Sequence, residues 1–359
     1  MGLDHSLNIR VGRMEKGPLN LITDVPGLRV GHVTLADGPA QTGVTAILPH
    51  GGNCFEEKLP LGFDIINGFG KSMGLVQAGE LGQLETPITL TNTLSSGTAF
   101  TALCRYMMER NPEIGRETGT VNPMVMECND GWLNDIRGLH VKESDVMAAI
   151  GAADAFFEEG AVGAGRGMIC HGLKGGIGSA SRVFEIAGSR YTLGVLALTN
   201  HGELENLCIA GRQVGQAARA LIEGGWHSPA SSIQPPREDK GSVILIAATD
   251  LPLSAGQLKR VARRAVAGLS RTGNAIGHGS GEIALCFSTA NRVRHFDKAD
   301  FRTTRELNER HIGLPFHAIA EAAEEAVLSS MFRARAVEGR DGHRAESLAE
   351  VWKALGEGH

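Results

Sequence analysis

Aromatic residues are scarce in this chain, and long apolar runs are missing. Phe, Tyr and Trp make up 5% of its 359 residues, so the core must be built mainly from aliphatic side chains. No apolar window reaches the length of about 18 residues that a membrane-spanning helix needs. The first 17 residues also lack the apolar stretch of a signal peptide. We therefore expect a cytoplasmic protein that does not act in a membrane.

Basic clusters are missing as well. The chain carries 35 Lys and Arg against 40 Asp and Glu, a net charge of −5, with no Lys/Arg block. Nucleic acids and anionic membranes are bound through such blocks, so neither is an expected partner. With 42% hydrophobic and 21% charged residues, the composition is that of a globular chain with a sizeable core.

Disulfide and metal-binding patterns are absent from the sequence. The six cysteines are scattered and form no CxxC pair, which favours reduced, buried thiols. The 13 histidines form neither an HxxxH nor an HExxH pattern, and Cys170-His171 has no second pair. We predict neither a metal site nor a cofactor.

Glycine is abundant, at 48 residues spread along the chain. Gly70-Lys71-Ser72 ends like a phosphate-binding P-loop, but Ile65 stands where that motif needs a glycine. Two further stretches, GAGRG at 163–167 and GLKGGIGS at 172–179, lack the spacing of a dinucleotide fingerprint. We therefore do not predict a P-loop, and we interpret the other two stretches as tight turns, with ligand-approach loops as the alternative.

The order of the predicted elements favours a layered α+β sandwich over an alternating parallel fold. Strands come in runs and helices follow them, and His227–Lys240 (HSPASSIQPPREDK) is the one convincing linker. The predicted strands are Val44–Leu48, Ile88–Leu90, Tyr191–Thr199, Val243–Ala248 and Glu282–Phe287, and the predicted helices are Asp145–Glu159, Glu203–Glu223, a helix capped by Ser254 and ended by Gly273, Phe316–Met331 and Ser347–Leu355.

Ser242 stands where the linker ends and an apolar strand begins, in EDKGSVILIAATD. A Gly-Ser pair before a strand is commonly no more than a turn. In GHGSGEIALCF, however, Ser280 and Glu282 enter another strand two residues apart, a spacing that puts both on one face. A carboxylate there is costly unless it is paired. If the two strands are neighbours, the three side chains form a proton network.

A serine nucleophile needs a base, and no GxSxG elbow with a histidine partner is present. Cleavage of the Gly241–Ser242 bond would supply one, because Ser242 would then own an α-amine with a pKa of about 8. The hydroxyl of Ser242 can attack the preceding carbonyl, and Gly241 offers little steric resistance. Self-cleavage at this bond is therefore plausible chemistry.

These residues lie within a longer resemblance. The chain resembles the L-aminopeptidase/D-esterase and β-peptidyl aminopeptidase family of self-cleaving serine hydrolases, in the same order from about residue 15 to about 345. The matching stretches are ITDVPGLRVGHVT (22–34), ECNDGWLNDIRG (127–138), TNHG (199–202), GSVILIAATDLPL (241–253), GHGSGEIALCFSTANR (277–292) and GRDGHR (339–344).

The resemblance implies one hydrolase domain over residues 1–359, an αββα four-layer sandwich similar to N-terminal nucleophile hydrolases but with different strand connectivity. It also implies autoproteolysis between Gly241 and Ser242 into residues 1–241 and 242–359. Ser242 matches the family's nucleophile, and Ser280 and Glu282 match the residues that assist it. The expected assembly is a homo-oligomer, a tetramer of αβ units.

Three more positions match site residues of the family. Asn200 matches an oxyanion-hole amide, and Glu127 matches an acid that holds the free ammonium of the substrate. Trp132 stands where one member has a tyrosine; because an indole donates but does not accept, Trp132 is expected only to line the substrate site. The implied substrates are small peptides, amides or esters with a free amino end.

Two other functions stay open at this point. Self-cleaving acyltransferases of similar fold use threonine as the nucleophile, whereas this chain has Ser242. The second alternative is an uncleaved binding protein for a small molecule, without catalytic activity, in which Gly241-Ser242 is only a turn. Comparing acyl transfer with hydrolysis tests the first, and a denaturing gel that shows one band or two tests the second.

Overall fold

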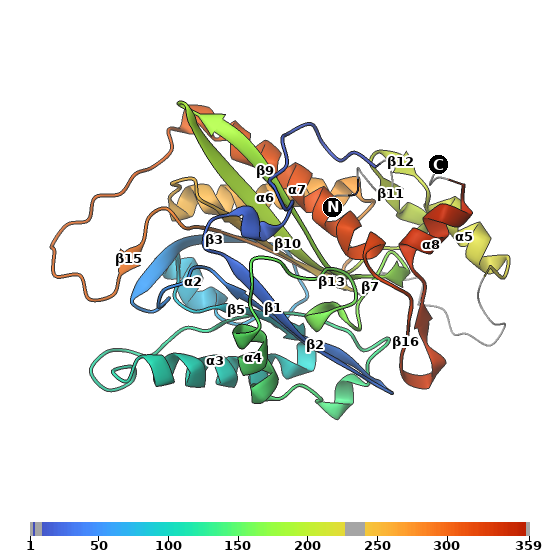
Figure 1. Ribbon diagram of the computed structural model, residues 1–359, viewed down its shortest axis with the longest axis horizontal. Helices are drawn as coiled ribbons and strands as arrows, with labels where there is room; N and C mark the ends of the chain where they lie inside the picture. The colour runs from blue at the N-terminus through green and yellow to red at the C-terminus, as the bar shows by residue number, and fades with distance from the viewer. Residues whose placement is uncertain (1–2, 4–8, 227–240, 357–359) are drawn as a thin grey trace.

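The computed structural model describes residues 3, 9–226 and 241–356, and it has four layers (Figure 1). Two β-sheets lie face to face in the middle, and helices cover the outer face of each. The expected α+β class and αββα sandwich are therefore confirmed. The predicted linker His227–Lys240 lies outside the described residues. Among the helices that are described, none is long and apolar enough to cross a membrane.

The smaller sheet has four strands in the order β1-β2-β5-β6. Strands β1 and β2 form an antiparallel hairpin, while β5 and β6 are parallel and are connected through α3. Helices α3 and α4 cover its outer face. The bounds are β1 Arg29–Asp37, β2 Ala40–Leu48, β5 Ile88–Asn92, α3 Ser96–Arg110, β6 Met124–Cys128 and α4 Glu143–Gly151.

The larger sheet has the order β15-β3-β14-β13-β10-β9, and the short strand β4 pairs with β3. Its two central strands, β13 and β14, are parallel and are connected through α6, while the other pairs are antiparallel. Helices α6 and α7 cover its outer face. The bounds are β3 Glu57–Gly68, β4 Gln83–Leu84, β9 Gly176–Ile186, β10 Ser189–Asn200, β13 Ser242–Thr249, α6 Ala255–Arg271, β14 Gly281–Ser288, β15 Val293–Arg294 and α7 Gly313–Phe332.

Short elements complete the described chain around these layers. Among them, β7 and β8 form a tight hairpin just before β9. The bounds are α2 Leu75–Leu81, β7 Ile169–Cys170, β8 Leu173–Lys174, β11 Cys208–Ile209, β12 Arg212–Gln213, α5 Gly215–Glu223, β16 Val337–Glu338, β17 Arg344–Ala345 and α8 Leu348–Ala354.

Strand β13 lies in the middle of the sandwich, and its side chains alternate between two cores. Val243 and Leu245 pack in the core beneath α6 and α7, whereas Ile244 and Ile246 pack between the two sheets. All eight residues of the strand are buried. Burial on both faces explains why this segment is an unbroken apolar run rather than an alternating one.

Most predicted elements are confirmed, including all five strands. Helix α6 begins where the cap was expected, since the Ser254 hydroxyl accepts a hydrogen bond from the backbone N–H of Gln257 at 3.4 Å. It ends just before Gly273, which has φ = +95°. Helices α7 and α8 occupy the two predicted C-terminal segments.

Two helix predictions are wrong in part. The segment predicted as Asp145–Glu159 is helical only to Gly151, because the chain then turns so that Asp154 can pair with Val30 at the edge of β1. The segment predicted as Glu203–Glu223 is helical at its end, in α5, and forms a short 3₁₀ turn at Leu204–Asn206. Between them, β11 and β12 form a hairpin whose turn residues, Ala210 and Gly211, have positive φ.

In the glycine-rich stretches at 163–167 and 172–179, glycines stand where two backbone segments come close together. A Cβ on Gly165 would lie 2.5 Å from the backbone nitrogen of Ile177. A Cβ on Gly176 would lie 2.5 Å from the carbonyl carbon of Gly160. Neither position tolerates a side chain, so these glycines allow the loops to pack onto β9.

Candidate active site

Ser242 is the first residue of β13, and both neighbouring strands deliver a predicted site residue beside it. Asn200, the last residue of β10, is its register partner on one side. Gly281, between Ser280 and Glu282, is its register partner on the other side. The prediction that the Ser242 strand and the Ser280–Glu282 strand are neighbours is confirmed. Ser242 is buried, and its hydroxyl has no hydrogen-bond partner among the described residues.

The peptide bond before Ser242 is tightly enclosed. The backbone N–H of Gly281 donates to the carbonyl oxygen of Gly241 at 3.2 Å. A Cβ on Gly241 would lie 2.7 Å from the carbonyl carbon of Asn200 and 2.9 Å from the Cα of His201. Any residue other than glycine would therefore push this bond out of its place between the two strands.

Ser280 and Glu282 form a fully buried pair. The Ser280 hydroxyl donates a short hydrogen bond to the Glu282 carboxylate, which confirms the predicted contact between them. The backbone around them is held from β3, because the Asn67 side chain donates to the carbonyl oxygens of Ser280 and, at 3.1 Å, of Gly277. A buried carboxylate with a hydroxyl attached is an arrangement that can accept or pass on a proton.

The side-chain amide of Asn200 is oriented by two hydrogen bonds. Its Oδ1 accepts from the backbone N–H of Ile169 at 3.0 Å, and its Nδ2 donates to the carbonyl oxygen of Asn129 at 2.9 Å. An amide nitrogen carries two hydrogens, so one N–H is still able to donate to a substrate oxygen. The orientation is fixed before any substrate binds.

Glu127 lies on β6 in the smaller sheet. Its carboxylate accepts a hydrogen bond from the backbone N–H of Lys71 at 2.7 Å and a short one from the hydroxyl of Thr93. Within the part of the chain that the structure describes, Glu127 forms no ion pair, and the guanidinium of Arg166 donates to Gln41 at 2.7 Å. The side chain is 3% exposed, so its negative charge is nearly buried without a cation.

Gly70 connects Glu127 to the Ser280–Glu282 segment. A Cβ on Gly70 would lie 3.5 Å from Oε1 of Glu127, and a Cβ on Gly281 would lie 3.3 Å from the Cα of Gly70. The segment that contains Gly70 is therefore wedged between the acid of one sheet and the start of β14 in the other. The backbone at Gly70 thus lies close both to Glu127 and to the start of β14.

Trp132 is held by the C-terminal segment. Its ring stacks on that of His343, with 3.8 Å between centroids and 16° between planes, and its carbonyl oxygen interacts with Nδ1 of His343 at 2.7 Å. Arg340 binds the preceding carbonyl, that of Gly131, at 2.9 Å. The GRDGHR stretch thus positions Trp132, whose role in lining the substrate site stays a prediction.

The chain matches known proteins over a range that includes all of these candidate site residues. The sequence profile of peptidase family S58 matches residues 20–345. The chain belongs to peptidase family S58. It is a serine-type aminopeptidase, because its relatives carry that activity in their names and match it along nearly the whole chain.

Three relatives show how closely this S58 member matches. A β-peptidyl aminopeptidase, BapA, from Sphingosinicella microcystinivorans is 37% identical over 347 residues, which cover 92% of this chain and 86% of the relative. The PH0078 protein from Pyrococcus horikoshii OT3 is 48% identical, with a TM-score of 0.90 and 99% of each chain covered. The L-aminopeptidase D-Ala-esterase/amidase from Ochrobactrum anthropi is 34% identical, with a TM-score of 0.86 and 98% of each chain covered, and is described as a variant of the Ntn hydrolase fold.

Three features of this S58 site were missed by sequence reasoning. Cys128, next to Glu127 on β6, lies beside the candidate nucleophile: burial raises the pKa of its thiol, and an interaction with the Ser242 side chain lowers it in part. Lys71 and Thr93 supply the hydrogen bonds to Glu127. The one signal in the sequence was Gly70, next to Lys71, which we compared only with a phosphate-binding P-loop.

A cavity beside β9 lies apart from the candidate site. It has a volume of about 500 Å³, is lined by Ser179, Glu159 and Arg333, and contains none of the candidate site residues. One of its acids is already bonded, since Glu159 accepts hydrogen bonds from the hydroxyl of Ser329 and the backbone N–H of Ser179, both at 2.7 Å. The candidate site is therefore the place where the site residues come together around Ser242, and not this cavity.

Proposed function

We propose that this S58 peptidase is self-cleaving, that Ser242 is its N-terminal nucleophile, and that it removes the first residue of small peptides, amides or esters with a free amino end. The observation that carries the proposal is the register around Ser242. Strand β10 presents Asn200 on one side, and strand β14 presents the Ser280–Glu282 pair on the other. The names of the relatives, which cover β-peptidyl, L- and D-alanyl substrates, support this substrate class.

Maturation begins with the hydroxyl of Ser242, which attacks the carbonyl carbon of Gly241. The N–H of Gly281 donates to that carbonyl oxygen and polarises it. The C–N bond breaks as the serine nitrogen takes a proton, and an ester joins Gly241 to the Ser242 oxygen. Water then hydrolyses the ester, which leaves residues 1–241 with a carboxylate and residues 242–359 with a free α-amine.

In the mature enzyme, the α-amine of Ser242 takes the proton of its own hydroxyl as the oxygen attacks the substrate carbonyl. The second N–H of Asn200 donates to the oxygen on which negative charge develops. Ser280 and Glu282 stabilise the charged amine and return the proton to the leaving group. Water then releases the acyl group and restores Ser242.

Glu127 gives the enzyme its requirement for a free amino end. A substrate ammonium would pair with a carboxylate that is nearly buried and that already accepts two hydrogen bonds. Pairing relieves the cost of burying the charge, so a substrate with a blocked amine binds less well.

The test combines a denaturing gel with hydrolysis assays. Purified wild type is expected to give two bands, the fragments 1–241 and 242–359, and to hydrolyse amino-acid p-nitroanilides. Ser242→Ala is expected to stay one chain and to be inactive, whereas Ser288→Ala, at the other end of β14, should still be cleaved. Cleavage of pure Ser242→Ala at the same bond would refute the intramolecular mechanism.

We also propose that the mature enzyme is a homo-oligomer, a tetramer of αβ units, in the cytoplasm. Both statements rest on the family resemblance and on the predictions from the sequence. Light scattering coupled to gel filtration would measure the mass in solution, and the mass of a single chain would contradict the assembly.

A further inference from the structure

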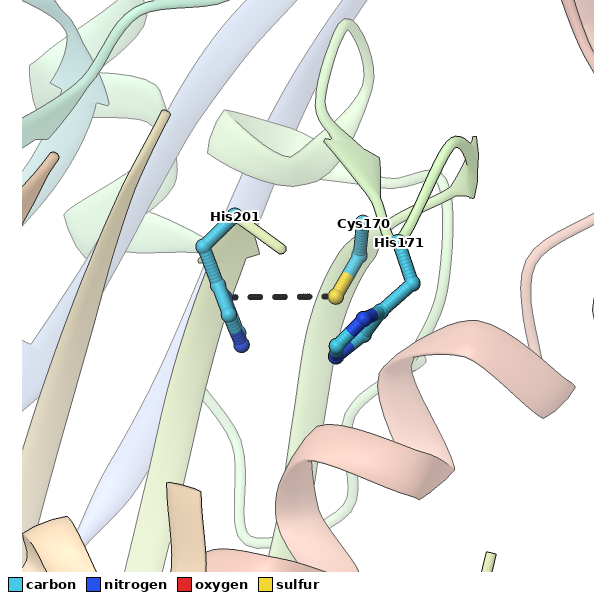
Figure 2. A group of neighbouring side chains, drawn as sticks. All are labelled: Cys170, His171 and His201. Carbon is cyan, nitrogen blue, oxygen red and sulfur yellow. Dashed lines mark hydrogen bonds between the residues drawn. The ribbon is translucent and has the colours of Figure 1, made fainter. Parts of the chain in front are cut away.

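Side chains that could hold a metal ion come together next to the candidate oxyanion residue, from two segments that are separated in the sequence. Cys170 and His171 lie at the β7–β8 hairpin, and His201 directly follows Asn200 at the end of β10 (Figure 2). Their donor atoms all lie within 4.8 Å of one another. All three residues are buried, with 0–2% of their surface exposed. Neither the S58 mechanism proposed above nor any part of the substrate site uses them.

The spacing of the donors fits a shared metal ion. The sulfur of Cys170 lies 3.9 Å from Nδ1 of His201. With metal–sulfur and metal–nitrogen bonds of about 2.3 and 2.05 Å, two ligands at the corners of a trigonal site lie about 3.8 Å apart. The two imidazole rings are arranged edge to face, with 5.4 Å between centroids and 68° between planes. The donor atom of His171 lies within 4.8 Å of the other two.

Hydrogen bonding prepares His171 as a ligand. Its Nδ1 lies 3.0 Å from the carbonyl oxygen of Glu203, which can only accept, so Nδ1 carries the hydrogen and Nε2 of the neutral ring carries the lone pair. This contact to a backbone carbonyl is the usual way in which proteins fix the tautomer of a metal-binding histidine. His171 also has φ = +47°, an unusual backbone conformation for a residue with a side chain.

The third donor comes from His201, which is 2% exposed. Its Nε2 is buried and has no hydrogen-bond partner among the described residues. A buried ring nitrogen without a partner is costly. One of the two nitrogens of a neutral imidazole is always unprotonated, so the ring can supply a lone pair to a metal.

We propose that Cys170, His171 and His201 form a binding site for a thiophilic d¹⁰ cation, Cu⁺ or Zn²⁺. One thiolate and two neutral imidazoles bring a single negative charge and three soft or intermediate ligands, a set suited to both ions. With Cu⁺ the site would be neutral and complete with three ligands, whereas Zn²⁺ would leave one positive charge and require a fourth ligand. Cu⁺ is therefore the better match for a buried location.

A bound ion would link the β7–β8 hairpin to the end of β10, which carries Asn200. The backbone N–H of His171 donates to the carbonyl oxygen of His201 at 2.7 Å, and that of Ile169 donates to the side chain of Asn200 at 3.0 Å. A metal ion between Cys170 and His201 would tie the same two segments together a second time. We expect the bound ion to raise the Tm without being required for hydrolysis.

The experiment measures metal content, so its result does not depend on the hydrolase mechanism. Wild type, Cys170→Ala, His201→Ala and the control Cys286→Ala, which removes another fully buried thiol, are each incubated with Zn²⁺, or with Cu⁺ under anaerobic reducing conditions. Free metal is removed by gel filtration, and the retained metal is measured by mass spectrometry. We expect wild type and Cys286→Ala to retain about one ion per chain and the two site variants to lose it.

The metal that is retained identifies the occupant. If wild type retains neither ion, or if Cys170→Ala retains as much as wild type, the proposal is wrong. A second measurement on wild type covers the case in which the site variants do not fold. Co²⁺ bound at this site must show a thiolate-to-cobalt charge-transfer band, and its absence at full Co²⁺ loading would also overturn the proposal.

Discussion

Asn200 and Ser242 are register partners across the antiparallel pair of β10 and β13. The candidate oxyanion donor ends one strand and the candidate nucleophile begins its neighbour, so both lie at the same strand ends of the sheet. The amide of Asn200 is also anchored by hydrogen bonds to the backbone of Ile169 and Asn129. Its position is therefore set by the backbone of three segments rather than by the mobility of a loop.

This anchoring leads to a prediction for Asn200→Ala. Removing one oxyanion donor typically lowers kcat by about 10²- to 10³-fold. Because the amide donates to an oxygen that is charged only in the transition state, KM should change much less than kcat. Steady-state hydrolysis of an L-alanine p-nitroanilide by the cleaved variant measures both constants. Asn206→Ala, which removes an amide bonded only to nearby Glu203, is the control; an unchanged kcat in Asn200→Ala would remove Asn200 from the reaction.

Gly241 should be essential for self-cleavage on steric grounds. A methyl group at this position would meet the backbone of Asn200 and His201 within 3 Å, so Gly241→Ala must displace the bond that Ser242 attacks. We expect the purified variant to stay uncut, or to be cut at least tenfold more slowly, on a denaturing gel followed over time. Gly256→Ala is the matched control, because no atom lies within 4 Å of a Cβ there. Normal cleavage of Gly241→Ala would mean that the enclosure of this bond is unimportant.

Glu127→Gln tests how the amino end of the substrate is recognised. A charge-assisted contact to an ammonium is worth about 1.5–3 kcal/mol, so substrates with a free amine should lose roughly 10- to 150-fold in kcat/KM. The glutamine Oε1 can still accept from the backbone N–H of Lys71, and its amide nitrogen can donate to the hydroxyl oxygen of Thr93, so folding and the cut before Ser242 should be retained.

The decisive comparison for Glu127 uses an amino-acid amide and its N-acetylated twin. Wild type should strongly prefer the free amine, and Glu127→Gln should lose most of that preference, whereas Glu143→Gln, a partly exposed acid paired with Arg105, should keep it. Equal hydrolysis of both compounds by wild type would show that no ammonium is recognised, and Glu127 would then need another role.

The two central strands were predictable because burial on both faces leaves a strong signal. Segments such as Val243–Ala248 have an unbroken aliphatic run between turn residues, and few other structures suit such a run. The pairing of Ser280 with Glu282 followed from their spacing alone. The helix predicted through Glu159 failed because a tertiary contact, the pairing of Asp154 with Val30, overrides local preference at the end of α4.

Contacts between distant segments could not be predicted from periodicity. No pattern in the sequence says that Asn200 lies opposite Ser242; that expectation came from the family resemblance. The hydrogen bonds from Lys71 and Thr93 to Glu127 join three separate parts of the smaller sheet and its surroundings. For the same reason, searching for metal motifs by spacing missed His201, which the fold brings to Cys170 from 31 residues away.

Asp130 should make the stability of the protein fall as pH rises. The side chain is fully buried and bonded to Asn134 at 3.0 Å, and burial raises the pKa of its carboxyl to about 7. Between the ordinary pKa near 4 and this value, the folded state holds a proton that the unfolded state has released. The free energy of unfolding therefore decreases with pH in this window, by up to about 1.4 kcal/mol per pH unit from this group.

Asp130→Asn should remove that dependence, because an amide keeps the neutral form at every pH. Urea unfolding at pH 5, 6, 7 and 8 would measure the free energy of unfolding of wild type, Asp130→Asn and the exposed control Asp300→Asn. As pH rises from 5 to 7, we expect the free energy of unfolding of wild type to fall relative to that of Asp130→Asn. Above pH 7, this relative change should become small. Parallel curves for the two proteins would show that Asp130 is already ionised in the folded state at pH 5, and that the buried segment around Trp132 tolerates a full negative charge.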